Sequence, residues 1–174
     1  MDRVAAVDGV ETIDFKGQYG LEVDDEAALL AMYERTLATF TEAVFEDPHD
    51  HPAVLEMLTP FAERVSYDAP ITSVESLSAT PITPRIINVK PCRVGRLPEL
   101  SRLYAHCESA GIRMYNGGMG ELGAGRGQAQ LLAALFHPDA PNDIAPSGYN
   151  LETLPPGLPA SPLDPAPGRG FRRR

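Results

Sequence analysis

Cysteine and long apolar runs are scarce in this 174-residue sequence. Its two cysteines, Cys92 and Cys107, do not have the spacing of a metal site. No apolar run approaches the roughly 20 residues that a membrane-spanning helix needs. The acidic start, MDRVAAVDG, is not typical of a signal peptide. These absences predict a cytoplasmic protein with reduced thiols and no membrane partner.

Positive charge is also scarce. Lysine and arginine total 15 against 24 aspartate and glutamate residues, so the formal net charge is −9. Binding to nucleic acid needs a basic face for the phosphates, whereas the basic cluster here is Arg169 with Arg172 to Arg174, at the end of the chain. We therefore expect no nucleic-acid partner.

What is present is typical of a folded globular chain. The hydrophobic fraction is 43% and the charged fraction 22%, and the length suffices for one substantial core or part of a larger one. Residues 1–150 are expected to form one domain. From residue 151 the chain becomes rich in proline and glycine, as in PPGLPASPLDPAPGRG, which predicts an extended tail over 151–174.

Within 1–150 short β-branched runs alternate with helical patterns. The pattern predicts five helices, the third of them weak, and six strands: Val10–Phe15, Ala43–Phe45, Arg64–Tyr67, Ile86–Val89, Ile112–Tyr115 and Asp143–Ala145. Such alternation indicates an α/β protein with a parallel sheet, either open or part of a closed barrel.

The most informative stretch is Ile86 to Gly125, which reads as strand, helix, strand and glycine-rich turn. Pro91 ends the strand just after Lys90, and Gly111 suits the left-handed turn that closes the helix. Two strands joined by a helix are parallel and open on the same side of the sheet. We therefore expect Lys90 and Glu121 to face one pocket.

Charged residues end four consecutive strands: Asp14, Glu46, Asp68 and Lys90. Such a distribution favours a barrel, because a barrel assembles its site from many strand ends, whereas an open sheet concentrates it at one switch point. Three neighbouring carboxylates repel unless a cation neutralises them, and oxygen ligands suit Mg²⁺ or Mn²⁺. The alternative is that these are solvated loop acids.

These residues resemble the enolase superfamily, in its mandelate racemase and muconate-lactonizing branch. The resemblance runs from about Val10 to Asn150 and is carried by four motifs: IDFKGQYG, FEDP, INVKPCRVG and GGMGELGAGRG. It implies a partial (β/α) TIM-type barrel with about six parallel strands and no amino-terminal capping domain.

The resemblance also implies roles for individual residues. Asp14, Glu46 and Asp68 would be the magnesium ligands, and Lys90 would be the acid/base acting on the carbon next to a carboxylate. Glu121 would be an orienting or electrostatic residue beside the reacting carbon. The implied reaction is Mg-dependent removal of a proton from a small carboxylate substrate, giving a metal-stabilised enediolate.

Several positions depart from the family pattern. The Lys-x-Lys pair on a strand before Asp14 is missing, which favours a dehydratase, cycloisomerase or lyase over a racemase. Lys16 replaces an asparagine, and its position two residues after Asp14 makes it a candidate contact for a ligand or substrate anion. Cys92 and Arg96 stand where small residues are expected.

Two other motifs have competing interpretations. Gly118, Gly120 and Gly123 spell GxGxxG, the signature of a phosphate cradle, although a dinucleotide site in the fifth unit leaves the strand-end acids unexplained. His49 and His51 have the chemistry of metal ligands, but solvated loop histidines are the commoner case.

The sequence thus predicts part of an enolase-like barrel. The competing hypothesis is a truncated, non-catalytic barrel protein that acts as a subunit or binds small anions. Because about six parallel strands leave open sheet edges, we expect self-association or a partner segment that completes the barrel.

Overall fold

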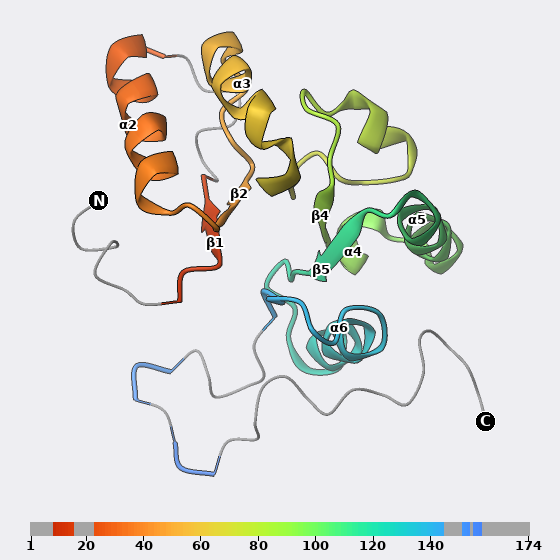
Figure 1. The fold of residues 1–174 in the computed structure, drawn as a ribbon. Helices are drawn as coiled ribbons and strands as arrows, with labels where there is room; N and C mark the ends of the chain where they lie inside the picture. The colour runs from red at the N-terminus through yellow and green to blue at the C-terminus, as the bar shows by residue number, and fades with distance from the viewer. Residues whose placement is uncertain (1–8, 16–22, 145–150, 154, 158–174) are drawn as a thin grey trace. The chain divides into compact units, whose positions relative to one another are not determined.

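The structure is a computed structural model that describes residues 9–15, 23–144, 151–153 and 155–157. Lys16 and most of the predicted tail lie outside these ranges. Strands and helices alternate along the chain (Figure 1). The elements are β1 (Thr12–Asp14), α2 (Glu26–Thr39), β2 (Val44–Glu46), α3 (Pro52–Leu58), η1 (Thr59–Arg64), β3 (Val65–Tyr67), η2 (Glu75–Ala79), β4 (Ile86–Val89), α4 (Pro91–Val94), α5 (Leu97–Ala110), β5 (Arg113–Asn116) and α6 (Gly123–Phe136).

The strands follow one another in the sheet in the order of the sequence, β1-β2-β3-β4-β5. β1 to β4 pair in parallel, as expected for strands joined by helical connections. Every residue of β3 and β4 is buried, which is typical of parallel strands covered on both faces. Where the sixth strand was predicted, the described residues form an isolated parallel bridge between Gly117 and Asp143.

The chain divides into two compact units, which we describe separately. The first comprises Met1–Pro70 with Glu75–Ile87, and the second Ile71–Val74 with Asn88–Arg174. In the part of the chain that the structure describes, no helix has the length and apolar character needed to cross a membrane.

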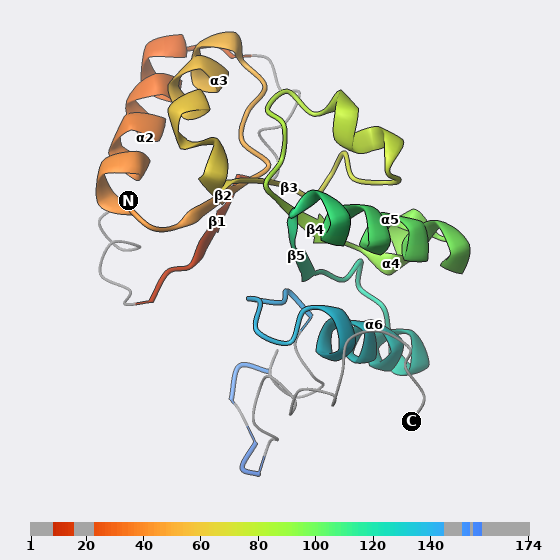
Figure 2. The same cartoon turned by 45° about the vertical axis from the view of Figure 1, so that its right-hand side comes forward.

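The first unit packs around aromatic residues. Phe15 stacks on Tyr33 at 4.6 Å between ring centroids, and its ring meets Phe45 edge-on at 5.9 Å. α2 and α3 lie side by side in both views (Figures 1 and 2). The guanidinium of Arg64 donates to the carbonyl oxygens of Phe40 and Ala43 and lies 4.8 Å from the Phe45 ring centroid.

Helix ends in both units follow local sequence rules. Asp25 caps α2 by accepting a hydrogen bond from the Ala28 N–H at 2.9 Å. α5 ends at Gly111, whose φ of 68° is the left-handed conformation that glycine adopts without strain. In α6 the buried positions are Ala129 and Ala133, whereas Leu131 is 56% exposed.

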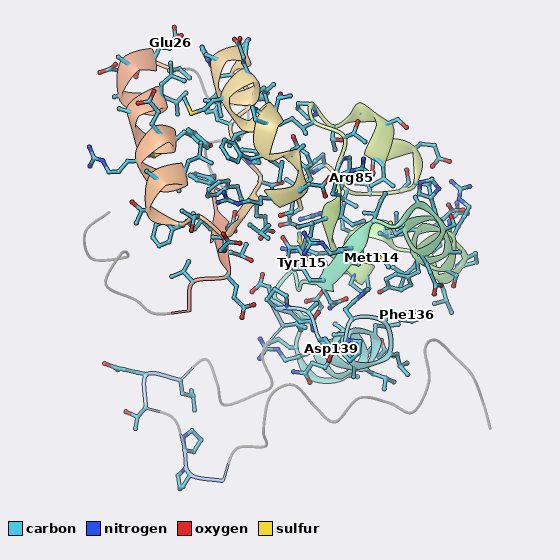
Figure 3. All side chains as sticks on the ribbon, viewed as in Figure 1. Glu26, Arg85, Met114, Tyr115, Phe136 and Asp139 are labelled. Atoms are coloured by element: carbon cyan, nitrogen blue, oxygen red, sulfur yellow. The ribbon has the colours of Figure 1, made fainter. Side chains whose placement is uncertain are left out.

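The second unit buries one face of α5. Tyr104 of this helix stacks on Phe136 at 4.2 Å and lies 5.2 Å from the ring of His137, both at the carboxyl end of α6; Figure 3 labels Phe136. Both ring nitrogens of His137 are buried without a hydrogen-bond partner, and so is the Tyr104 hydroxyl. Burial lowers the pKa of His137 to about 4, although the neighbouring Phe136 backbone opposes the shift.

His137 makes the stability of the chain depend on pH. As pH falls from about 6.5 to about 4, His137 becomes protonated in the unfolded chain but stays neutral in the folded one. The free energy of unfolding therefore decreases across this window by up to ~3 kcal/mol. We expect His137→Phe to remove this loss. Urea unfolding at pH 7 and pH 4.5 measures the free energy of unfolding of the unchanged chain and of His137→Phe. The difference between the two proteins should change in favour of His137→Phe at the lower pH, and the same difference at both pH values would contradict the prediction.

Candidate functional site

The first group of predicted site residues lies in the first unit, at the carboxyl ends of β1 to β3. Asp14 is the register partner of Glu46, and Glu46 that of Ser66. Paired residues on adjacent parallel strands point to the same face of the sheet, so the ladder places Asp14 and Glu46 on one face. Asp14 is exposed, Glu46 is 5% exposed, and Asp68, one residue after β3, is fully buried.

Asp47, which sequence reasoning did not select, ties the ends of β2 and β3 together. Its carboxylate accepts hydrogen bonds from the N–H groups of Asp68 at 2.7 Å and Ala69 at 2.9 Å. Its φ of 46° lies in the left-handed region, which aspartate tolerates better than most residues. An aspartate directly before Pro48, at the start of a loop, was the available signal.

Negative charge accumulates at this end of the sheet. Burial raises the pKa of Asp47, the two backbone hydrogen bonds oppose the rise, and the charges of Asp68 and Asp14 add to it. A group of oxygen donors that repel one another suits Mg²⁺ chemically. As the side chains stand, however, no three His, Cys, Asp or Glu residues in the described ranges form a metal-holding group.

The loop after β2 contains two histidines, His49 and His51, and His49 helps to hold the loop in place. The prediction that they are solvated is wrong for His49, which is 4% exposed. Its backbone N–H donates to the Tyr33 hydroxyl at 2.8 Å, and its Nδ1 accepts from the His51 N–H at 3.0 Å. Their rings lie 6.3 Å apart. His49 therefore anchors the loop to α2.

The second group of predicted site residues lies in the second unit. Lys90 follows β4 directly and is 4% exposed, and Pro91 at the first position of α4 turns the chain there. Gly117, just after β5, approaches it closely: a β-carbon at Gly117 would lie 2.6 Å from Lys90 Cε and 2.5 Å from Asn88 Oδ1. The absence of a side chain at Gly117 thus makes room for the lysine.

Glu121 lies within electrostatic reach of Lys90. One of its carboxylate oxygens accepts a hydrogen bond from the Met119 N–H at 2.7 Å. Partial burial by itself raises the pKa of Glu121, but hydrogen bonds from the Cys92 thiol and from backbone N–H groups, together with the Lys90 charge, outweigh it. The pKa of Glu121 is therefore lowered, and the residue is ionised at neutral pH.

The glycine-rich turn has a packing explanation. A β-carbon at Gly118 would lie 2.6 Å from Ile144 Cδ1 and 2.9 Å from Glu121 Oε2. The turn is tied to the following segment, because the Gly118 N–H donates to the Asp143 carbonyl oxygen at 3.3 Å. Gly118 is thus accounted for by close contacts, without a phosphate.

The chain is similar to several known proteins. A family described as "Domain of unknown function (DUF8230) C-terminal domain" matches residues 1–151. An o-succinylbenzoate synthase of Geobacillus stearothermophilus is 34% identical over 136 residues, which are 76% of this chain and 33% of that protein. An N-succinylamino acid racemase of Thermus thermophilus is 44% identical over 61 residues, or 35% of this chain and 16% of that protein.

Solved structures give the same result for the fold. An enolase-superfamily member of unknown function from Enterococcus faecalis matches 77% of this chain and 36% of its own, with 25% identity and a TM-score of 0.58. A dipeptide epimerase of Methylococcus capsulatus, solved with Mg and a dipeptide, matches 72% of this chain and 35% of its own, with 25% identity and a TM-score of 0.53. The resemblance and the partial (β/α) barrel are confirmed. The chain spans about a third or less of the length of these relatives.

Gly117→Ala tests the close approach to Lys90. The added methyl group has to displace the lysine or the Asn88 side chain, so we expect a loss of about 1–3 kcal/mol in the free energy of unfolding. Gly127→Ala in α6 is the matched control. Nothing lies within 4 Å of its β-carbon position, and alanine favours a helix by about 0.5–1 kcal/mol. Urea unfolding measures the free energy of unfolding of both variants, and equal values would contradict the close approach of Gly117 to Lys90.

Proposed function

Since this chain belongs to the DUF8230 C-terminal domain family and has the partial barrel of the enolase superfamily, we propose that it serves a Mg²⁺-dependent removal of a proton next to a substrate carboxylate. The observation that carries the proposal is the register of β1 and β2, which pairs two predicted metal ligands, Asp14 and Glu46, across adjacent strands.

The proposed metal ligands are Asp14, Glu46 and Asp68. Their donor type fits Mg²⁺, which takes oxygen ligands, and a cation would also relieve the repulsion that Asp14 and Asp68 exert on the neighbouring Asp47. When bound, the ion would stabilise the negative charge that develops on the substrate carboxylate. Asp47 would hold the loop that carries Asp68 through its two backbone hydrogen bonds.

Lys90 is the proposed acid/base. Lys90 is buried and lies next to Gly117. Its neutral amine would take up the proton on one face of the substrate, and the ammonium group formed in this way would return it. One such residue suits dehydration, cycloisomerisation or a lyase reaction better than racemisation, which exchanges protons on two faces.

For the substrate class, the names of the relatives support small carboxylates. Their names mention o-succinylbenzoate, N-succinylamino acids and dipeptides, so small carboxylates with an acyl or amino-acid part are the compounds to test. Glu121, ionised and within reach of the Lys90 charge, would orient the lysine or favour its protonated form. We also propose that the open sheet edges are covered by self-association or by a partner segment.

Metal binding is the first test. Isothermal titration calorimetry of the chain with Mg²⁺ should give one site, and Glu46→Gln should weaken it by roughly tenfold or more because a charged ligand is lost. Glu56→Gln, an exposed residue of α3, is the control and should leave the affinity unchanged. Equal affinity in the unchanged chain and in Glu46→Gln would refute the ligand assignment.

Proton exchange is the second test. In D₂O with Mg²⁺, proton NMR should show loss of the α-proton signal of an N-succinylamino acid or a dipeptide. Lys90→Ala should slow this exchange by at least about 100-fold and leave Mg²⁺ affinity intact. Exchange retained in Lys90→Ala but lost in Lys16→Ala would move the base to Lys16. No exchange in the unchanged chain would favour the non-catalytic alternative.

A further inference from the structure

Asn88 is a buried amide on the strand that leads to Lys90, and the proposed function gives it no role. It is the third residue of β4, two positions before the lysine, and is fully buried. Lys90 keeps an extended backbone, with φ −103° and ψ 104°. Side chains alternate between the two faces of an extended chain, so those of Asn88 and Lys90 point to the same face of the sheet.

Gly117, just after β5, shows how near these two side chains lie to each other. A β-carbon at Gly117 would be 2.5 Å from Asn88 Oδ1, 2.9 Å from Asn88 Nδ2 and 2.6 Å from Lys90 Cε. The amide oxygen and the lysine carbon therefore lie at most about twice this distance apart. The Gly117 N–H donates to the Val89 carbonyl oxygen at 3.2 Å, which fixes the glycine beside the residue between them. Both side chains thus occupy the space that the glycine leaves open.

Asn116 is a second buried amide in the same unit and shows a different use of the residue. It is fully buried, and its Nδ2 donates to the carbonyl oxygens of Gly117 at 3.4 Å and Ala129 at 3.3 Å. These bonds tie β5 to α6 through the backbone. Asn116 therefore has a structural explanation, whereas the carboxamide of Asn88 lies against the side chain of the proposed base.

We propose that Asn88 is a positioning residue, whose carboxamide holds the side chain of Lys90 in one direction beside Gly117. Its part in the reaction rests on the proposed function, but the contact between the side chains does not. A carboxamide is neutral, so it fixes the lysine without adding to the charge of Glu121, which already interacts with Lys90. A carboxylate at position 88 would favour the ammonium form and reduce the amount of neutral amine that accepts the proton.

Proton NMR of the full chain with carbon-13-labelled lysine tests the contact without any catalysis. The sequence has one other lysine, Lys16, and Lys90→Arg identifies the Lys90 signal by removing it. The two ε-protons of Lys90 should have separate chemical shifts in the unchanged chain, because the side chain is held in one direction, and should merge in Asn88→Ala. Asn116→Ala, which also removes a buried amide, is the matched control and should keep them separate. Separate signals in Asn88→Ala would overturn the proposal.

Asn88→Asp distinguishes positioning from a purely structural role, because it keeps the shape of the side chain and adds a charge. The pH midpoints of the Lys90 carbon-13 signal and of α-proton exchange should both move to higher pH. Exchange below the midpoint should become at least about tenfold slower and should recover above it. In Asn88→Ala, exchange should be about 10- to 100-fold slower at every pH. Midpoints that stay unchanged in folded Asn88→Asp would overturn the proposal. If this variant does not fold, the ε-proton signals of Asn88→Ala decide.

The two proposals fail on different measurements. If the Lys90 signals respond as expected but the unchanged chain exchanges no α-proton, the proposed function is refuted and the positioning contact stands. If the chain exchanges the proton but the Lys90 signals do not respond to substitution of Asn88, the positioning role is refuted and the proposed function stands.

Discussion

The parallel backbone ladder of β1 to β3 is the constraint on which the arrangement of the acidic groups depends. These strands have three residues each, and the ladder continues past their ends: the Phe15 N–H donates to the Glu46 carbonyl oxygen and the Asp47 N–H to that of Ser66, both at 3.0 Å. Because the pairing extends to the acidic residues, their backbone positions are set by hydrogen bonds of the sheet. A slip of one residue would turn Glu46 to the opposite face.

Holding like charges together costs stability, and the first unit offsets this cost locally. Asp47 is buried with a raised pKa, yet it accepts two backbone hydrogen bonds that stabilise its charged form. The aromatic contacts of Phe15, Tyr33 and Phe45 pack the first unit elsewhere. A cation would relieve the remaining repulsion. Metal affinity and stability of this unit are therefore expected to rise together.

In the second unit the corresponding constraint is space. Lys90 is buried because Gly117 has no side chain, and Glu121 is accommodated because Gly118 has none. The Glu121 carboxylate thus lies against Gly118, accepts a hydrogen bond from the Met119 N–H and lies near the Lys90 charge, which explains why its ionised state is favoured despite partial burial.

The sequence by itself determined the order of elements and, to within one residue, the carboxyl ends of β1 to β5. β4 has the predicted bounds, Asp25 and Gly111 delimit their helices, and the acids lie at the carboxyl ends of their strands as expected, because caps, prolines and β-branched runs act over a few residues. The family motifs likewise predicted the partial barrel.

Tertiary structure decided what depends on residues distant in the sequence. It buried His49 under Tyr33 and exposed Leu131. It also made Asp47 the link between β2 and β3, and brought Gly117 against Lys90. No local pattern encodes such contacts, because they arise only when the sheet register and the packing of the helices bring the groups together.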